Sequence, residues 1–185
     1  MRVTDAQLPD VKIIQPSLFE DDRGYFMESY SYKALQQHGI SIDFVQDNHS
    51  LSLLAGTLRG LHYQLEPKAQ TKLVRVTAGA IYDVVVDLRR GSPTFGMWEG
   101  FTLSAENKLQ LLVPKGFAHG FCTIAPHTEI QYKVDNDYAA EHERGIIWND
   151  PMLSIDWPVM EPVLSNKDQR NGLFVQSEYD FLYKG

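Results

Sequence analysis

The 185-residue sequence contains one cysteine, Cys122, so no intrachain disulfide can form. Disulfides are typical of secreted proteins, and their absence predicts an intracellular chain. Cys122 lies in the apolar segment Gly-Phe-Cys-Thr-Ile over residues 120–124, which predicts a packed and unreactive thiol.

Long apolar runs are missing as well. The first ten residues lack the continuous apolar core of a secretory signal, and no segment approaches the roughly 20 residues of a membrane span. We therefore predict a cytoplasmic, soluble protein that has no membrane partner. In that compartment the sequence Asn48-His49-Ser50, which has the form of a glycosylation site, stays unmodified.

Positive charge is in deficit. The chain has 17 Lys and Arg against 24 Asp and Glu, a formal net charge of -7. An acidic protein gains no counterion release from nucleic acid and no attraction to an anionic membrane, which argues against non-specific binding to either. An anionic ligand would need a local basic pocket.

Helical segments are scarce. Residues 31–39, S-Y-K-A-L-Q-Q-H-G, contain good helix formers and end in glycine, which predicts a short helix of two turns. No helix of crossover length separates the β-rich segments, which argues against a parallel α/β sheet. The tail from Asn149 carries three prolines before Leu164 and predicts an irregular wrap that ends in a short helix.

Short segments rich in β-branched and aromatic residues recur with Gly, Pro or Asn between them. The run of residues 11–19 and the segment 25–30 predict two strands joined by the turn Asp21-Asp22-Arg23-Gly24. Further strands are expected at residues 44–48, 57–64, 72–77, 80–88, 98–103, 109–113, 120–124 and 128–134. This pattern predicts an all-β sandwich or jelly roll, and the length predicts one domain over residues 1–185.

The stretch G-T-L-R-G-L-H-Y-Q over residues 56–64 contains the first candidate catalytic residue. If the strand is regular, Leu58, Gly60 and His62 lie on one face, and Arg59, Leu61 and Tyr63 lie on the other. An imidazole can act as a base near neutral pH, and a guanidinium suits a phosphate. The alternative is a core histidine that bonds a backbone carbonyl.

Several cations lie at expected strand ends and turns, where a sandwich gathers its loops: Arg23, Arg59, Lys72, Arg75, Lys115 and Lys167. Together they would form a pocket for a diphosphate, although each alone fits a solvated surface residue. Their spacing does not show whether they converge.

Two tyrosines and one aspartate have both a structural and a chemical interpretation. Tyr132 and Tyr138 can pack, donate a proton or stack on a base. Asp168 follows Ser165 at the spacing of a helix cap, and it could equally orient a histidine.

A metal site is not expected. His62 is followed by Tyr63 and Gln64, so the His-x-His ligand pair of metal-binding cupins is missing. His119 and the segment His127-Thr128-Glu129 remain as possible ligands.

A set of motifs covers nearly the whole chain in a fixed order. They are D-D-R-G-Y-F-M-E (21–28), F-V-Q-D-N-H-S (44–50), L-R-G-L-H-Y-Q (58–64), K-L-V-R-V (72–76), D-L-R-R-G-S-P-T-F-G-M-W (87–98), L-S-A-E-N (103–107), V-P-K-G-F-A-H-G-F (113–121), E-R-G-I-I-W-N-D-P (143–151) and L-S-N-K-D (164–168). On these motifs the sequence resembles the dTDP-4-dehydrorhamnose 3,5-epimerase family. The resemblance implies a cupin-type jelly-roll barrel with a few short peripheral helices.

The resemblance also implies an activity. It is the epimerisation of dTDP-4-dehydro-6-deoxy-D-glucose at ring positions 3 and 5 to dTDP-4-dehydro-β-L-rhamnose, which needs no cofactor because proton transfer leaves the oxidation state unchanged. The implied assembly is a homodimer with exchanged N-terminal strands.

The implied residue roles follow the matching positions. His62 resembles the catalytic base, Asp168 its orienting partner, Tyr132 the general acid and Lys72 the cation beside the enolate. Tyr138 resembles the thymine-stacking residue. The positions that match nucleotide- and sugar-contacting residues are Arg23, Phe26, Glu28, Gln46, Asn48, Arg59, His119, Glu143 and Lys167, and of these Arg23, Phe26 and Glu28 can reach the site of the neighbouring subunit in the family.

The sequence departs from the family pattern at two places. Asp137 and Ala140 stand where members commonly have an aromatic residue and a proline, and the loop of residues 51–56 is one residue longer than usual. Three alternatives stay open: an epimerase of a related dTDP-4-keto-6-deoxy sugar that acts at position 3 or 5 only, a metal-dependent cupin oxygenase or isomerase, and a sugar-nucleotide binding module without catalysis.

Overall fold

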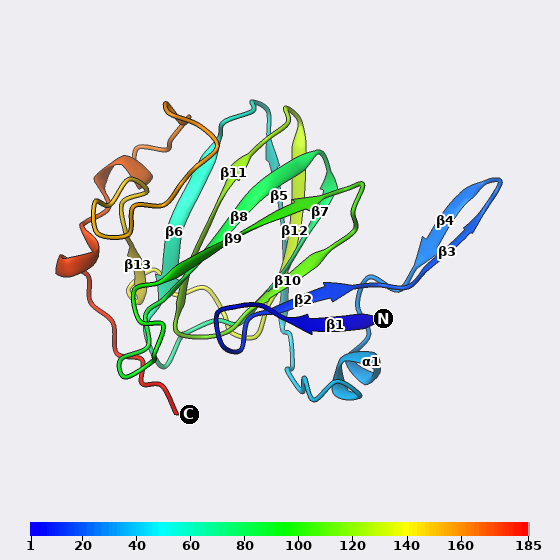
Figure 1. Ribbon diagram of the computed structural model, residues 1–185, viewed down its shortest axis with the longest axis horizontal. Helices are drawn as coiled ribbons and strands as arrows, with labels where there is room; N and C mark the ends of the chain where they lie inside the picture. The colour runs from blue at the N-terminus through cyan, green and yellow to red at the C-terminus, as the bar shows by residue number, and fades with distance from the viewer. Residues whose placement is uncertain (185) are drawn as a thin grey trace.

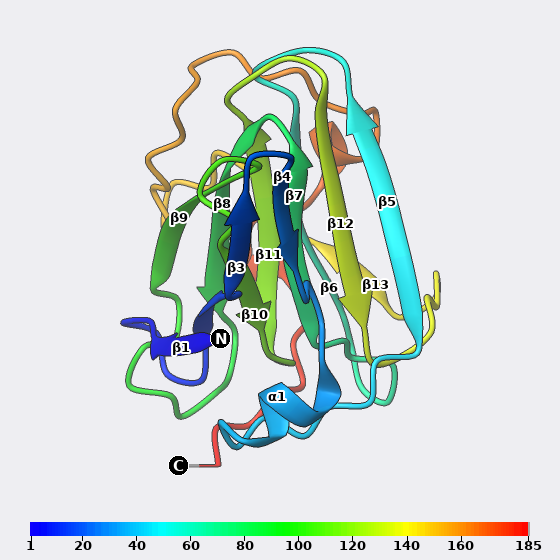
Figure 2. The same cartoon turned by 90° about the vertical axis from the view of Figure 1, so that its right-hand side faces the viewer.

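Two antiparallel sheets packed face to face form the body of the computed structural model, which describes residues 1–184 (Figures 1 and 2). The first sheet has the order β1 (Arg2–Asp5), β2 (Lys12–Gln15), β10 (Gln110–Val113), β7 (Lys72–Ala78), β12 (Thr128–Val134) and β5 (Gln46–Ser52). The second has the order β13 (Glu143–Gly145), β6 (Leu58–Gln64), β11 (Phe117–Thr123), β8 (Ala80–Asp87) and β9 (Trp98–Ser104). The predicted all-β jelly roll is confirmed.

The core between the sheets follows the two-residue alternation of the strands. On β8, Ile81 and Val85 point between the sheets, whereas Val84 and Val86 point to the opposite face of the second sheet. All four are fully buried because the C-terminal wrap covers that opposite face. The wrap contains two short 3₁₀ helices, η1 (Asp168–Arg170) and η2 (Phe174–Gln176).

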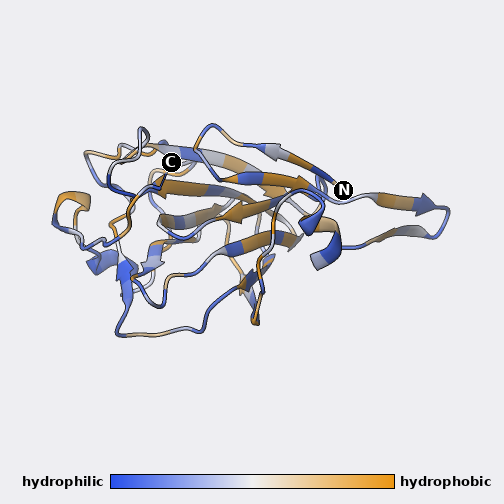
Figure 3. Ribbon diagram, turned by 90° about the horizontal axis from the view of Figure 1, so that it is seen from below, coloured by the Kyte–Doolittle hydropathy of each residue, from blue (hydrophilic) through white to orange (hydrophobic). Residues whose placement is uncertain are grey.

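A hairpin of β3 (Leu18–Asp21) and β4 (Gly24–Met27) belongs to neither large sheet and projects away from the body (Figure 1). The run of residues 11–19, predicted as one strand, is two strands, because Pro16 lies between β2 and β3 and cannot donate a ladder hydrogen bond. The projecting strands carry apolar residues (Figure 3), and Phe19 and Phe26 are 64% and 66% exposed. The hairpin therefore presents exposed apolar surface.

One short helix, α1 (Tyr32–Gln36), lies at the end of the first sheet (Figure 2). The Ser31 side chain accepts from the backbone N–H of Ala34, which satisfies one of the unpaired donors of the first turn. Leu35 packs with Ile14 and Leu73 on the outer face of the sheet. The helix is shorter than the predicted segment. In residues 1–184 no helix has the length and apolar character to cross a membrane.

Candidate active site

A cavity of about 480 Å³ opens between the sheets. Strands β6, β7, β11 and β12 and the segment of residues 163–168 supply its walls. Seven residues singled out from the sequence line it: Arg59, His62, Lys72, His119, Tyr132, Lys167 and Asp168. Three of the six candidate cations thus converge, which sequence spacing does not reveal.

An irregularity in β6 brings Arg59 and His62 to the same cavity. In the pairing of β11 with β6, His119 lies opposite His62 and Phe121 lies opposite Arg59. The two β11 residues are two positions apart, whereas the two β6 residues are three positions apart. Strand β6 therefore contains one extra residue, a β-bulge, at this place. Gly60 has φ +132°, and a Cβ at this position would lie 2.5 Å from the Gly120 Cα. The prediction that Arg59 and His62 lie on opposite faces is therefore wrong, because the bulge breaks the alternation.

His62 and Asp168, 106 residues apart, form the closest polar pair in the cavity. The His62 Nε2 and Asp168 Oδ1 atoms are 2.5 Å apart, and the Asp168 residue is 3% exposed. Ser165 Oγ donates to Asp168 Oδ2 at 2.8 Å and accepts from the Asp168 backbone N–H at 3.0 Å. Asp168 thus contacts His62 with one carboxylate oxygen and the Ser165 hydroxyl with the other.

Asp168 is held ionised in the folded chain. Burial alone would raise its pKa, but the hydrogen bond and charge of His62, together with Ser165 and Lys167, hold the pKa of Asp168 below its ordinary value. A charged Oδ1 accepts, so His62 Nε2 carries the hydrogen, and Nδ1 is the ring nitrogen left with a lone pair when the imidazole is neutral.

Lys72 on β7 and Tyr132 on β12 line the same cavity, and in the register of these paired strands Tyr132 lies opposite Val74, two residues from Lys72. Burial disfavours the ammonium and lowers the pKa of Lys72 to about 8, although the charges of Asp83 and Glu143 act in the opposite direction. Burial also raises the pKa of Tyr132, an effect that the charge of Arg59 partly offsets. At neutral pH the cavity therefore holds a cationic amine and a neutral phenol that can donate a proton.

Lys167, which lines the cavity, forms a linked group with Glu143 and Tyr138. Glu143 accepts from the Tyr138 hydroxyl at 2.6 Å and pairs with Lys167 Nζ at 2.5 Å. Although burial would raise it, these two contacts and the charges of Lys167 and His62 hold the pKa of Glu143 below its ordinary value. The Tyr138 ring is 58% exposed and is free to contact a ligand at the rim.

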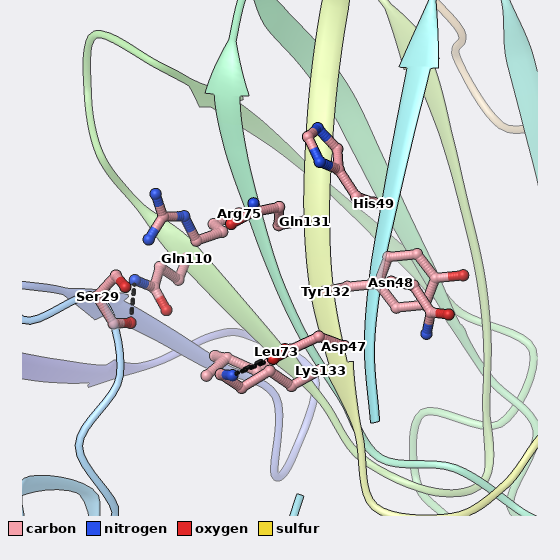
Figure 4. A pocket seen from close by; sticks show the side chains of 10 residues that line it. All are labelled: Ser29, Asp47, Asn48, His49, Leu73, Arg75, Gln110, Gln131, Tyr132 and Lys133. Atoms are coloured by element: carbon pink, nitrogen blue, oxygen red, sulfur yellow. Dashed lines mark hydrogen bonds and ion pairs between the residues drawn. The ribbon is translucent and has the colours of Figure 1, made fainter. Parts of the chain in front are cut away.

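Other predicted residues are not among those that line this cavity. Arg23 and Phe26 are on the projecting hairpin, and Glu28 directly follows it. Gln46 donates to Asn48 on β5, and Asn48 borders a second cavity of about 180 Å³, which is lined mainly from the outer face of the first sheet (Figure 4). Arg75 lines that second cavity, and Lys115 pairs with Asp135 at 3.3 Å.

The possible metal ligands do not come together. Within residues 1–184, no three His, Cys, Asp or Glu side chains form a group that could hold a metal ion. The ring of His119 bonds to Asp83, and Glu129 pairs with His49 at 2.9 Å.

Comparison with known proteins decides the family. The family model described as dTDP-4-dehydrorhamnose 3,5-epimerase matches residues 5–176. The chain belongs to the dTDP-4-dehydrorhamnose 3,5-epimerase family. It is thus a carbohydrate epimerase of dTDP-rhamnose biosynthesis.

Similar epimerases cover nearly the full chain. The Shigella flexneri dTDP-4-dehydrorhamnose 3,5-epimerase is 52% identical over 180 residues, covering 97% of this chain and 99% of the relative. The crystal structure of the Bacillus anthracis enzyme with TDP and PPi bound is 57% identical with a TM-score of 0.91, and the match covers 93% of this chain and 98% of that one. The Legionella pneumophila 3,5-epimerase in complex with dTDP-4-keto-L-rhamnose is 46% identical with a TM-score of 0.91, over 96% and 94% of the two chains.

Two polar residues at or beside the epimerase cavity were not predicted to be functional from the sequence. Ser165 was considered only as a helix cap, and Asp83 was not identified at all. Asp83 is the single charged residue inside the apolar run of residues 80–86, and its carboxylate oxygens lie 2.9 and 3.0 Å from His119 Nε2. A lone acid at an inward position of a central strand is the signal that could have found it.

Proposed function

We propose that this epimerase inverts carbons 3 and 5 of dTDP-4-dehydro-6-deoxy-D-glucose and forms dTDP-4-dehydro-β-L-rhamnose without a cofactor. The observation that carries the proposal is the His62–Asp168 pair in a cavity that also holds Lys72 and Tyr132. The ligand of the Legionella pneumophila relative, dTDP-4-keto-L-rhamnose, belongs to the class that this reaction yields.

His62 is the base in this scheme. The 4-keto group acidifies the hydrogens on carbons 3 and 5, so one base can remove either proton. Because His62 Nε2 donates to Asp168, Nδ1 takes the proton from carbon, and the electron pair of the broken C–H bond moves to the carbonyl oxygen as an enolate. The ionised Asp168 stabilises the imidazolium that results.

Lys72 and Tyr132 complete the inversion. The Lys72 ammonium stabilises the negative charge that develops on the enolate oxygen, and one such donor is worth about 100-fold or more in rate in other enzymes. The neutral Tyr132 hydroxyl then gives its proton to the same carbon from the face opposite His62. The imidazolium releases a proton and the tyrosinate recovers one, which restores both groups for the second carbon.

The dTDP part of the substrate is bound by groups remote from the chemistry. Arg59 and Lys167 supply positive charge for the diphosphate, and Tyr138 stacks on the thymine. His119, Glu143, Gln46 and Asn48 contact the nucleotide or the sugar. Binding energy gained there can hold the ring in the reactive geometry.

The proposed assembly is a homodimer in which each projecting hairpin lies against the other subunit and brings Arg23, Phe26 and Glu28 to its site. The exposed Phe19 and Phe26 support this arrangement, because apolar surface on a two-stranded hairpin needs cover. We also propose that residues 1–185 form a single domain.

The test is substitution of His62 by alanine. His62→Ala should abolish exchange of substrate protons with solvent at both carbons, while dTDP binding measured by calorimetry stays within about threefold of the unsubstituted protein. His38→Ala, at an exposed position, is the matched control and should keep full exchange. Exchange retained in His62→Ala at either carbon would show that another group is the base.

A further inference from the structure

A buried acid on β8 has no assigned role in the reaction. Asp83 is fully buried (0% exposed) and shares the inward face of β8 with Ile81 and Val85, inside the apolar core. Burying an ionised carboxylate costs free energy unless the carboxylate is paired, so Asp83 is expected to have a hydrogen-bonding partner.

That partner is His119 on β11. His119 Nε2 lies 2.9 and 3.0 Å from the two Asp83 oxygens, and within residues 1–184 the Asp83 side chain forms no other hydrogen bond. The His119 side chain is 9% exposed and lines the main cavity opposite His62. The contact fixes the hydrogen on Nε2, so Nδ1 is the ring nitrogen left for a molecule in the cavity.

Asp83 also acts on Lys72. Burial lowers the pKa of Lys72, and the negative charge of Asp83 raises it; burial is the larger effect, so the pKa is about 8. Glu143, on β13, acts in the same direction as Asp83. The charged or titratable groups around Lys72 are Arg59 and His62 from β6, Asp83 from β8, His119 from β11, Tyr132 from β12, Glu143 from β13, and Lys167 and Asp168 at η1.

We propose that Asp83 is a positioning residue that fixes His119 with Nδ1 available to the substrate and supplies a buried negative charge beside the cavity that Lys72 lines. The part that concerns Lys72 rests on the proposed function, whereas the part that concerns His119 is a property of the free protein. The two parts are therefore tested by separate experiments.

Asp83→Asn tests the charge. Asparagine keeps the shape and one acceptor oxygen for His119, but it removes the negative charge that raises the pKa of Lys72. We expect kcat to fall by about 10-fold or more, as for loss of the partner of a functional histidine elsewhere. The alkaline limb of the kcat profile should move to lower pH, because the Lys72 ammonium loses its proton more readily. An unmoved limb in folded Asp83→Asn protein would overturn the role toward Lys72.

Asp87→Asn is the matched control on the same strand. Asp87 is also fully buried, and its carboxylate accepts from Arg89, Ser92 and Thr94 rather than from a cavity residue. This change should lower Tm but leave the alkaline limb in place. If the alkaline limb of the kcat profile moved equally in Asp83→Asn and Asp87→Asn, the shift would reflect general destabilisation, and the role of Asp83 toward Lys72 would be overturned.

Nitrogen-15 NMR of histidine-labelled, ligand-free protein tests the tautomer without catalysis. The His119 signals are assigned by their loss in His119→Gln. At neutral pH, Nε2 of His119 should carry a hydrogen in the unsubstituted protein, and an unprotonated Nε2 would overturn the proposal. This result stands even if Asp83→Asn does not fold, and it is independent of the substrate.

Discussion

Replacing Asp168 by asparagine probes the His62–Asp168 pair with little change in shape. The amide keeps one acceptor oxygen, but the contact at 2.5 Å changes from a charge-assisted hydrogen bond to a neutral one. A hydrogen bond to a charged group contributes about 1.5–3 kcal/mol and a neutral one about 0.5–1.5 kcal/mol, so the imidazolium formed during proton abstraction loses about 1–1.5 kcal/mol of stabilisation. At about 1.4 kcal/mol per tenfold, this loss corresponds to a rate lower by about 5- to 10-fold.

The assay for Asp168→Asn is the rate of solvent deuterium incorporation into the substrate, followed by proton NMR. Both carbons should slow by a similar factor, because one base serves both. Ser165→Ala keeps the charge of Asp168 and removes the contacts of the Ser165 hydroxyl with Oδ2 and with the Asp168 backbone N–H, so it should slow exchange less. Asp156→Asn, the same substitution at an exposed position, should have no effect. An Asp168→Asn rate within twofold of the unsubstituted protein would refute the role of the pair.

Three further predictions concern other parts of the cavity. Tyr132→Phe should slow inversion more than proton exchange, because abstraction remains while the opposite-face donor is lost; equal losses in NMR exchange and turnover would count against Tyr132 as the acid. Between pH 7 and 9, kcat should fall as the Lys72 ammonium, with a pKa of about 8, loses its proton. In Lys72→Arg the residual activity should persist to higher pH, and an identical profile would exclude Lys72 as the titrating group. Gly60→Ala should cost at least about 2 kcal/mol and lower Tm by about 4–8 °C, because the methyl group meets the Gly120 backbone at a positive φ; an unchanged Tm in calorimetry would contradict the bulge.

Most strands were predictable because turn residues separate them and β-branched residues fill them. The segment predicted at residues 128–134 is β12 itself, and that at residues 80–88 differs from β8 by one residue. Strands β1 and β13 were missed, because three or four residues carry no clear alternation and their pairing depends on distant partners.

Less of the site than of the fold could be predicted from the sequence. The extra residue in β6 brings Arg59 and His62 to the same cavity instead of to opposite faces, since the predicted alternation assumes a regular strand. The pairing of His62 with Asp168 crosses 106 residues of chain, so it could be stated only from family resemblance. Convergence of Arg59, Lys72 and Lys167 depends on how the two sheets and the wrap pack, which no local pattern encodes.

The most direct test of the account is proton NMR of dTDP-4-dehydro-6-deoxy-D-glucose in deuterated water with the purified, chelator-treated protein. We predict deuterium at carbons 3 and 5 together with conversion to dTDP-4-dehydro-β-L-rhamnose, and no incorporation with His62→Ala. Label at one carbon only, or exchange that requires added metal, would contradict the cofactor-free double epimerisation.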